Sequence, residues 1–355
     1  MNSGRDERID AVKGVAIWIV MLGHCIVLNG LADPYFYDAI AAVQMPLFMA
    51  VSGYTAGRFS KPFTGSVKER GKAFLKVFGR RSLSYLLPFF SWMLVTHITN
   101  PIEELKLQLF ATDRGLWFLM TLWIITVLAL LGEVLSPKEN LRWLAVSAVM
   151  ALGGVAFLLQ QHSGNTFLSP ALTVKYLPSY YVFYMGGLLL RQREAAGKVA
   201  DPAKTKAWNL RLSAACMAVF LYLVYAFDMV VAHSTFEFLL QELAGLCGSF
   251  AVFAITMTVH EGTRWKLVPF IGRFTLEIYV LHFRFARLLG IGDRALTPFT
   301  LPAVLWVLAA FLVMSMCTFL SIWLMKKVWF LDLIFFGKPS RPQKIGSKEK
   351  EPKDG

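Results

Sequence analysis

Long apolar runs dominate this 355-residue chain. They recur with lengths of about 17 to 24 residues, which is what a helix needs to cross the hydrocarbon core of a bilayer. Only 17% of the residues are charged, whereas a soluble protein carries about a quarter. The runs are continuous and do not alternate with polar residues, which excludes a transmembrane β-barrel. The sequence therefore predicts an all-α fold, a polytopic membrane helix bundle.

The runs predict about ten transmembrane helices. We place them at residues 14–30, 39–57, 83–99, 116–132, 143–161, 172–190, 212–231, 238–259, 267–283 and 302–325. Basic residues test this arrangement, because Lys and Arg are enriched in cytoplasmic loops. With both termini cytoplasmic, the inner segments hold 30 of the 36 Lys and Arg residues and the outer segments hold 6. This bias predicts an N-in and C-in topology.

The same inner segments account for the net charge of +13. Their basic residues flank apolar runs and face the head groups of membrane lipids, so nucleic acid is not predicted as a partner. We expect one transmembrane domain over residues 1–336 and a disordered, basic cytoplasmic tail over residues 337–355, which are polar and rich in Pro and Lys. The outer segment 97–115 has a partly helical pattern.

Neither a metal nor a bound cofactor is predicted. The four cysteines lie singly in four different spans and have no metal-ligand spacing. Nucleotide-binding and zinc motifs do not occur in a credible context. We expect the cysteines to act as small apolar side chains in packed helices.

Two ionisable residues stand out in the first span. Lys13 and His24 are eleven residues apart, so both side chains leave the same face of a helix, separated by roughly 16 Å along its axis. Lys13 lies at the membrane edge, where the charge bias alone also explains it. His24 lies deep in the apolar run, nearer the outer face, where an ionisable residue marks a functional site by default. The alternative is a neutral His that hydrogen-bonds a neighbouring helix. As a functional group, His24 suits general base work on a hydroxyl.

The ninth span carries a second group of polar residues. His282 lies near its outer end, at a depth comparable with that of His24. Glu277 lies near the middle, one turn after Arg273, and this spacing predicts an Arg273–Glu277 ion pair. Such a pair is interpreted either as part of a proton path or as a contact that orients two helices.

Small and aromatic residues mark two further spans. In the second span Pro46 predicts a kink, while Gly53 and Gly57 form a small-xxx-small pair for close helix contact. Ser52 lacks the context of a nucleophile elbow, so we expect a packing role for it. Trp117 begins the fourth span at the outer interface, where it is either an interfacial aromatic or a platform for a sugar ring.

The order of these motifs resembles the acyltransferase-3 family of integral membrane acyltransferases. The match opens with RIDAVKGVAIWIVMLGH, in which Asp10, Lys13, Gly14 and His24 occupy the positions of the family signature. It continues with MPLFMAVSGY, a basic run before LLPFFSW, GLWFLMTLW and TLEIYVLH, and it covers nearly the whole chain. The resemblance implies an enzyme of the bacterial inner (plasma) membrane that O-acylates sugars or surface glycans.

The resemblance also implies a donor and its binding residues. The donor is cytoplasmic acyl-CoA, most often acetyl-CoA, which acts as a substrate and not as a resident cofactor. Lys13, Arg80 and Arg81 are expected to hold its phosphates at the inner face. The pantetheine arm, roughly as long as the rise from Lys13 to His24, then carries the thioester up to the imidazole.

On the acceptor side, His24 is expected to act as the base toward the acceptor hydroxyl or to pass on the acyl group covalently. Glu277 or His282 orients His24 or shares its proton. A carbohydrate or lipid-linked glycan entering from outside meets Trp117 and His282. The identity of the acceptor, the length of the acyl chain and the oligomeric state are not contained in the sequence.

Three features depart from the family pattern. Gln44 occupies a position where sugar acetylases of the family often carry His, and the adjacent Arg80 and Arg81 replace a spaced Arg pair. No hydrolase-like domain follows the last span, so we expect only the membrane part of the reaction. The competing hypothesis is a proton-coupled transporter or flippase of a sugar or lipid-linked sugar. We disfavour it because the chain lacks the two matching halves common in transporters.

Overall fold

The computed structural model describes residues 6–31, 33, 35–57, 65–96, 100–110, 116–135, 147, 176–195, 202–232, 234–263, 265–290 and 296–338. Within these residues the fold is helical and contains no strand, which confirms the predicted all-α class. The helices are α1 (Glu7–Val27), α2 (Phe36–Gly57), α3 (Val67–Thr96), α4 (Pro101–Phe110), α5 (Trp117–Leu135), α7 (Leu177–Ala195), α8 (Pro202–Ala226), α9 (Thr235–Thr263), α10 (Leu267–Gly272), α11 (Thr275–Phe285), α12 (Leu301–Lys326) and α13 (Trp329–Phe336).

Five of the described helices are long and apolar enough to cross a membrane, namely α1, α2, α8, α9 and α12. The helix α5 is a shorter apolar helix, and α4 supplies the helical part expected in the segment 97–115. The predicted span 143–161 lies outside the described residues except for Ser147, and the predicted tail lies outside them from residue 339 onward. A count of about ten spans therefore stays a prediction.

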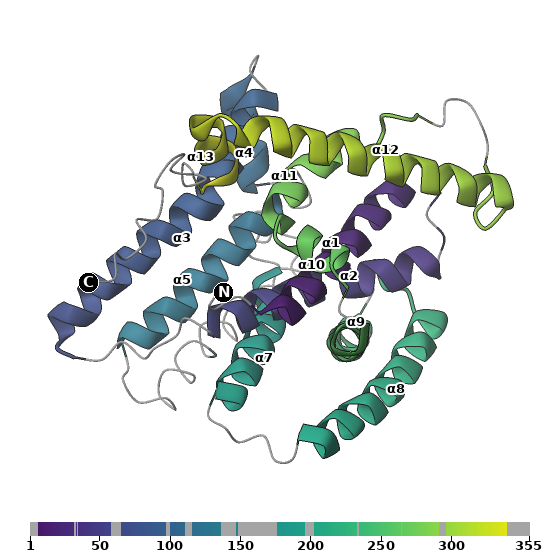
Figure 1. Ribbon diagram of the computed structural model, residues 1–355, viewed down its shortest axis with the longest axis horizontal. Coiled ribbons are helices and arrows are strands. Elements are labelled where there is room, and N and C mark those ends of the chain that lie inside the picture. The colour runs from purple at the N-terminus through teal and green to yellow at the C-terminus, as the bar shows by residue number, and fades with distance from the viewer. Residues whose placement is uncertain are drawn as a thin grey trace, which may run out of the picture.

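Helix α1 lies at the centre of the bundle, where it packs against α2, α9, α10, α11 and α12 (Figure 1). Buried residues recur along its length from Ile9 to Ile26, which is typical of an enclosed helix. Of its most apolar stretch 67% is buried, compared with 22% for α8 and for α12. The motif that carries Lys13 and His24 is thus built into the best-enclosed helix of the five.

Glycines set the closest helix contacts. A Cβ atom on Gly53 of α2 would overlap the carbonyl oxygen of Tyr184 on α7, and one on Gly187 of α7 would overlap the carbonyl oxygen of Ala50. The α1–α10 contact is built in the same reciprocal way from Gly14 and Gly272. The close contact predicted for Gly53 is present, because only a residue without a side chain lets the backbones approach this far.

The predicted ninth span is not one continuous helix. It divides into α10 and α11 at a turn formed by Arg273 and Phe274. The break follows Gly272, which lies against the backbone of α1, and the Thr275 hydroxyl donates to the Gly272 carbonyl oxygen released by the break. Because a regular helix does not continue from Arg273 to Glu277, the predicted ion pair between them is wrong. Arg273 instead lies 3.5 Å from Glu7, and Glu277 pairs with another helix.

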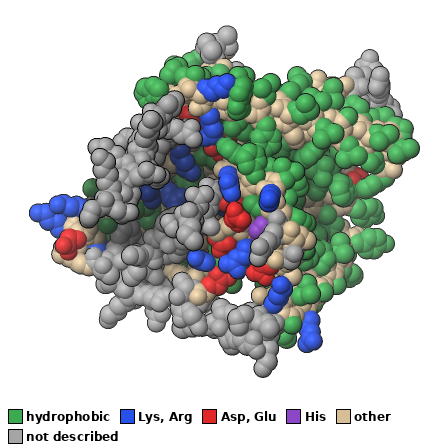
Figure 2. Space-filling view, viewed as in Figure 1, with side chains coloured by type: hydrophobic (Ala, Val, Ile, Leu, Met, Phe, Trp, Pro, Cys, Tyr) green, Lys and Arg blue, Asp and Glu red, His purple; other side chains and the backbone are tan. Residues whose placement is uncertain are grey.

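One side of the rim is apolar where the structure describes it. Figure 2 shows hydrophobic side chains over much of one rim, while the charged side chains gather near the centre of the face. On α12 the exposed apolar residues are Leu301, Val304, Leu305, Leu308, Leu312, Met316, Leu320, Trp323 and Leu324. An exposed face of this size on a helix that spans about 39 Å fits contact with lipid.

Candidate active site

Two histidines from distant parts of the chain meet inside the bundle. Nδ1 of His24 on α1 lies 3.0 Å from Nε2 of His282 on α11, and the ring centroids are 5.0 Å apart. His282 is 1% exposed, whereas His24 is half-buried. The structure therefore brings together two of the three residues that the sequence predicts to be catalytic, and His24 is the one with a more open side.

The hydrogen bonds of His282 define the proton positions in the pair. Its Nδ1 lies 2.9 Å from the carbonyl oxygen of Ile278, and because a carbonyl oxygen only accepts, this nitrogen carries a proton. In a neutral ring Nε2 is then the acceptor, so it receives the proton of His24 Nδ1. The remaining nitrogen of His24, Nε2, holds a free lone pair. This is the tautomer that a general base requires.

Contacts just beyond the histidines hold the ends of α1 and α11 together. The Asn29 side chain donates to the carbonyl oxygens of Cys25 and Ala286, at 2.8 and 3.0 Å. Arg287 donates from Nε to the carbonyl oxygen of Leu28 at 2.9 Å. The two helices therefore cannot separate at the level of His24 without breaking bonds to backbone groups.

An aromatic series leads from Trp117 to the histidines. Trp117 packs against Tyr176 and Tyr180, with ring centroids 4.3 and 5.9 Å away. Its neighbour Phe118 lies 5.5 Å from Tyr279, and Tyr279 lies 6.1 Å from His282. The predicted acceptor residue Trp117 is thus connected to the histidine pair through ring contacts and does not stand apart at the interface.

Lys13 lies about three turns below His24 on α1, and its Nζ is 3.8 Å from Oδ1 of the buried Asp10. Of the other predicted donor-binding residues, Arg81 is half-buried on α3 and donates to the Tyr85 hydroxyl at 3.2 Å, whereas Arg80 is exposed.

Gln44, on α2, lies against Gly23, and its Oε1 is buried without a hydrogen-bond partner among the described residues. This places a hydrogen-bond acceptor, the Gln44 amide oxygen, beside the turn that carries His24.

Glu277 faces away from His24. Its Oε1 lies 2.9 Å from Nζ of Lys326, which also lies 3.0 Å from Oδ1 of the fully buried Asp332. The contact joins α11 to α12 and α13, and five residues of helix turn Glu277 by about 140° from His282. The structure thus gives Glu277 a place in an interhelical ion pair and does not bring it to the histidines.

Comparison with known proteins identifies the chain. The model of the family described as an acyltransferase domain matches residues 6–326. The chain belongs to the acyltransferase-3 family. Nodulation protein NolL of Mesorhizobium japonicum is 24% identical over 385 residues, covering 98% of this chain and 94% of that protein. NolL of Sinorhizobium fredii is 27% identical over 169 residues, covering 42% of each chain. No solved structure matches.

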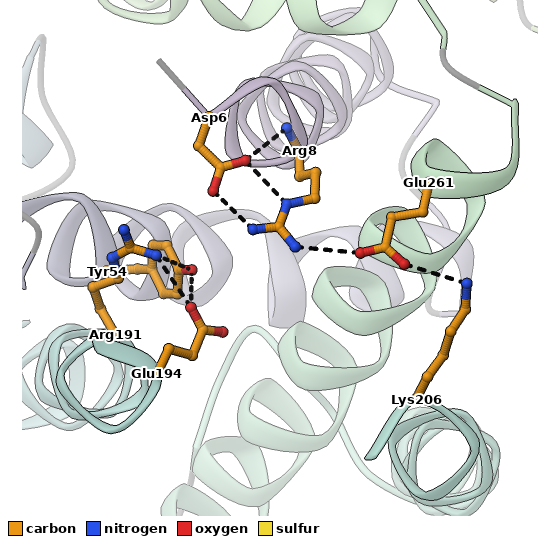
Figure 3. A network of polar contacts seen from close by, with 7 residues as sticks. All are labelled: Asp6, Arg8, Tyr54, Arg191, Glu194, Lys206 and Glu261. Atoms are coloured by element: carbon orange, nitrogen blue, oxygen red, sulfur yellow. Dashed lines mark hydrogen bonds and ion pairs between the residues drawn. The ribbon is translucent and has the colours of Figure 1, made fainter. Parts of the chain in front are cut away.

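One end of the helix bundle of this membrane acyltransferase carries a network of polar contacts (Figure 3). Arg8 binds Asp6 and lies 3.3 Å from Glu261, which lies 3.2 Å from Lys206. Nearby, Arg191 donates to the Tyr54 hydroxyl at 3.0 Å, and both bind Glu194. The groups come from the starts of α1 and α8 and the ends of α2, α7 and α9, which are the ends predicted to be cytoplasmic.

Sequence reasoning missed several of these residues. Tyr54 closes the motif MPLFMAVSGY, but nothing in the sequence shows that it bonds Arg191 and Glu194 on α7. Asp332 carried a usable signal, since an acidic residue inside the apolar run WFLDLIFF needs a partner. Ser52 lies half-buried beside Gly53, and its packing role stays a prediction. Among the described residues, no group of three or more His, Cys, Asp or Glu side chains is arranged to hold a metal.

Proposed function

We propose that this protein is a membrane O-acetyltransferase that moves the acetyl group of cytoplasmic acetyl-CoA to a hydroxyl of a sugar or cell-surface glycan. The observation that carries the proposal is the 3.0 Å contact between His24 and His282, which leaves a lone pair on the more open ring. The family match supports the reaction class, and the likeness to NolL extends along nearly the whole chain.

The donor enters from the side of Lys13. An ammonium group at this end of α1 attracts the phosphates of acyl-CoA, and the basic Arg80 and Arg81 of α3 add to this attraction. The rise from Lys13 to His24 is about 16 Å, roughly the length of a pantetheine arm. The thioester carbonyl therefore reaches the imidazole while the charged part of the donor stays at the membrane edge.

His24 acts as the general base in one direct transfer. Its Nε2 takes the proton of the acceptor hydroxyl as the oxygen attacks the thioester carbon. A carbon–oxygen bond forms, the carbon–sulfur bond breaks, and the proton passes from His24 to the departing thiolate. The products are the acetyl ester and CoA with a free thiol, so no oxidant or further reactant is needed.

His282 positions the base. It accepts the Nδ1 proton of His24 and thereby keeps Nε2 deprotonated and directed away from the pair. When Nε2 is protonated, the same hydrogen bond stabilises the imidazolium. Trp117 with Tyr176 and Tyr180 supplies aromatic surface that is connected to the histidine pair through Phe118 and Tyr279, and such surface suits a sugar ring.

The test is transfer of label from radiolabelled acetyl-CoA by purified protein in nanodiscs. Wild type is expected to release label to water or to an added glycan, and His24→Ala is expected to lose this activity. Cys25→Ala is the matched control, because Cys25 is the adjacent buried residue and, among the described residues, the only hydrogen bond of its side chain is to the Met314 sulfur. Transfer by His24→Ala at the wild-type rate would refute the proposed base.

A further inference from the structure

A cavity of about 540 Å³ lies at the end of α2 and α8 opposite the polar network of Figure 3. Its walls come from the segment before α2, the first turn of α2, the last turn of α8 and the residues after it. Six lining residues carry the chemistry, and we call this the Tyr–Asp pocket: Asp33, Tyr35, Tyr37, Asp38, Tyr225 and Asp228. Under the predicted topology the Tyr–Asp pocket opens on the outer side of the membrane.

Two of the tyrosines stack on each other at the pocket. The rings of Tyr35 and Tyr225 lie 5.8 Å apart with an angle of 17° between their planes. Tyr35 is 54% exposed and Tyr225 is 74% exposed, although both are large aromatic residues. The two stacked rings leave much of their surface exposed to a ligand, whereas a site for a compact cation arranges rings around the charge.

The carboxylates are fixed in place by backbone groups. Oδ1 of Asp33 accepts from Tyr35 and Phe36, at 2.9 and 2.7 Å, and Oδ1 of Asp228 accepts from the two residues at positions 230 and 231, at 2.7 and 2.8 Å. Oδ2 of Asp38 accepts from the backbone of Met229 at 2.9 Å and so ties α2 to the chain after α8. In each case the other oxygen makes no hydrogen bond to a described residue. It is a rigid acceptor without a partner in that part of the chain.

Exposed aromatic rings beside rigid hydrogen-bond acceptors suit a saccharide. Apolar faces of sugar rings stack on aromatic rings, and sugar hydroxyls donate to carboxylates. Three negative charges repel uronic acids and phosphates, which favours neutral or amino sugars. The described residues offer no three-ligand metal arrangement, which argues against a divalent cation as the occupant.

The Tyr–Asp pocket lies near the level of the histidine pair. Gly23, next to His24, lies directly against Ile40 of α2, and Asp38 precedes Ile40 by two residues, or about 3 Å of helix. We propose that the Tyr–Asp pocket is a saccharide subsite that holds non-reacting units of the acceptor glycan, outside the site where the hydroxyl is acylated. The identification of the bound saccharide as the acceptor rests on the proposed function. The binding of a saccharide does not itself require catalysis.

The binding test uses full-length His24→Ala in nanodiscs on an array of neutral, amino-sugar and uronic-acid glycans, so that no turnover occurs. We expect retention on neutral or amino-sugar glycans and a loss of tenfold or more when Tyr225→Ala is added. Asp228→Asn should also weaken binding, although Asn keeps the oxygen that accepts from the backbone. Tyr222→Ala is the matched control, since Tyr222 is on α8, is 65% exposed and does not line the pocket.

Two outcomes would overturn the proposal. One is equal retention by Tyr225→Ala and Tyr222→Ala, and the other is no retention of any glycan, which would leave the tyrosines as interfacial anchors. In catalytically active protein, Tyr225→Ala should raise the KM for the acceptor, whereas Tyr222→Ala should leave this KM at the wild-type value. If the proposed function were wrong, activity would not depend on acetyl-CoA. The binding of glycans by the His24→Ala protein would still be measurable.

Discussion

His24 and His282 lie 258 positions apart in the chain, yet their ring nitrogens meet at 3.0 Å across the contact between α1 and α11. His24→Ala should lower kcat by about 10²- to 10⁴-fold, because it removes the base. His282→Phe should lower kcat by about 10²-fold, because it frees His24 to rotate and to exchange tautomers. His282→Gln should lower kcat less than His282→Phe, since the amide oxygen of Gln can accept a hydrogen bond from His24.

Steady-state kinetics of the two single variants and the double variant distinguish the roles. If the histidines act as a unit, the double variant should be no slower than His24→Ala. The KM for acetyl-CoA should stay near wild type in all three. Additive losses would show that His282 acts independently of His24.

Lys13→Ala should raise the KM for acetyl-CoA with a smaller change in kcat, because the ammonium group attracts the donor and takes no part in bond making. Lys13→Arg should be milder, since it keeps the charge. Lys266→Ala is a control at an exposed cation directly before α10. A fall in kcat at unchanged KM would place Lys13 in the chemical step instead.

The adjacent glycines of α7 should differ sharply when each is replaced by Ala. At Gly187 a Cβ atom would overlap backbone atoms of α2, which cannot move aside, and such overpacking costs about 1–3 kcal/mol or more. At Gly186 no atom lies within 4 Å, and Ala favours the helix. Thermal unfolding in detergent should therefore show a lower Tm for Gly187→Ala and an equal or higher Tm for Gly186→Ala. Equal losses would contradict the α2–α7 contact.

Lys326→Met should destabilise the protein by about 3–5 kcal/mol, because it leaves Glu277 and the fully buried Asp332 without their shared cation. Adding Glu277→Gln to Lys326→Met should recover part of this loss, since one uncompensated charge disappears. Denaturation midpoints of the four proteins in this cycle measure the coupling. Full additivity would mean that the ion pair contributes nothing to joining α11 and α12.

Asp6 should make stability depend on pH in the acid range. Burial raises the pKa of Asp6, but the hydrogen bonds and charge of Arg8 outweigh it, so the pKa lies below its ordinary value of 3.8. A carboxylate of this kind stabilises the fold above its unfolded pKa and loses that effect as the pH falls through the folded value. The Tm difference between wild type and Asp6→Asn should therefore be steady from about pH 7 to 5 and shrink below about pH 4. A difference that persists at pH 3 would exclude this linkage.

The histidine pair shows how far local reasoning reaches. The period of 3.6 residues puts Lys13 and His24 on one face of α1, and the depth of His282 predicts that it lies at the level of His24. The same period fails at Arg273 and Glu277, because the helix breaks where Gly272 meets α1 and each charge finds a partner elsewhere. The period of 3.6 residues predicts which side chains share a face only while the helix is continuous.

The sequence by itself determined that this chain folds in a membrane, and it determined the helical class, the family and the motif of α1. These follow from run lengths, from the backbone hydrogen bonds that a bilayer demands, and from residue order. Only the tertiary structure decided which helices are central and that Glu277 pairs with Lys326 and is not brought to His24. It also decided that three tyrosines and three aspartates line one pocket. Contacts between distant segments depend on the summed packing of many side chains, and no local period encodes that sum.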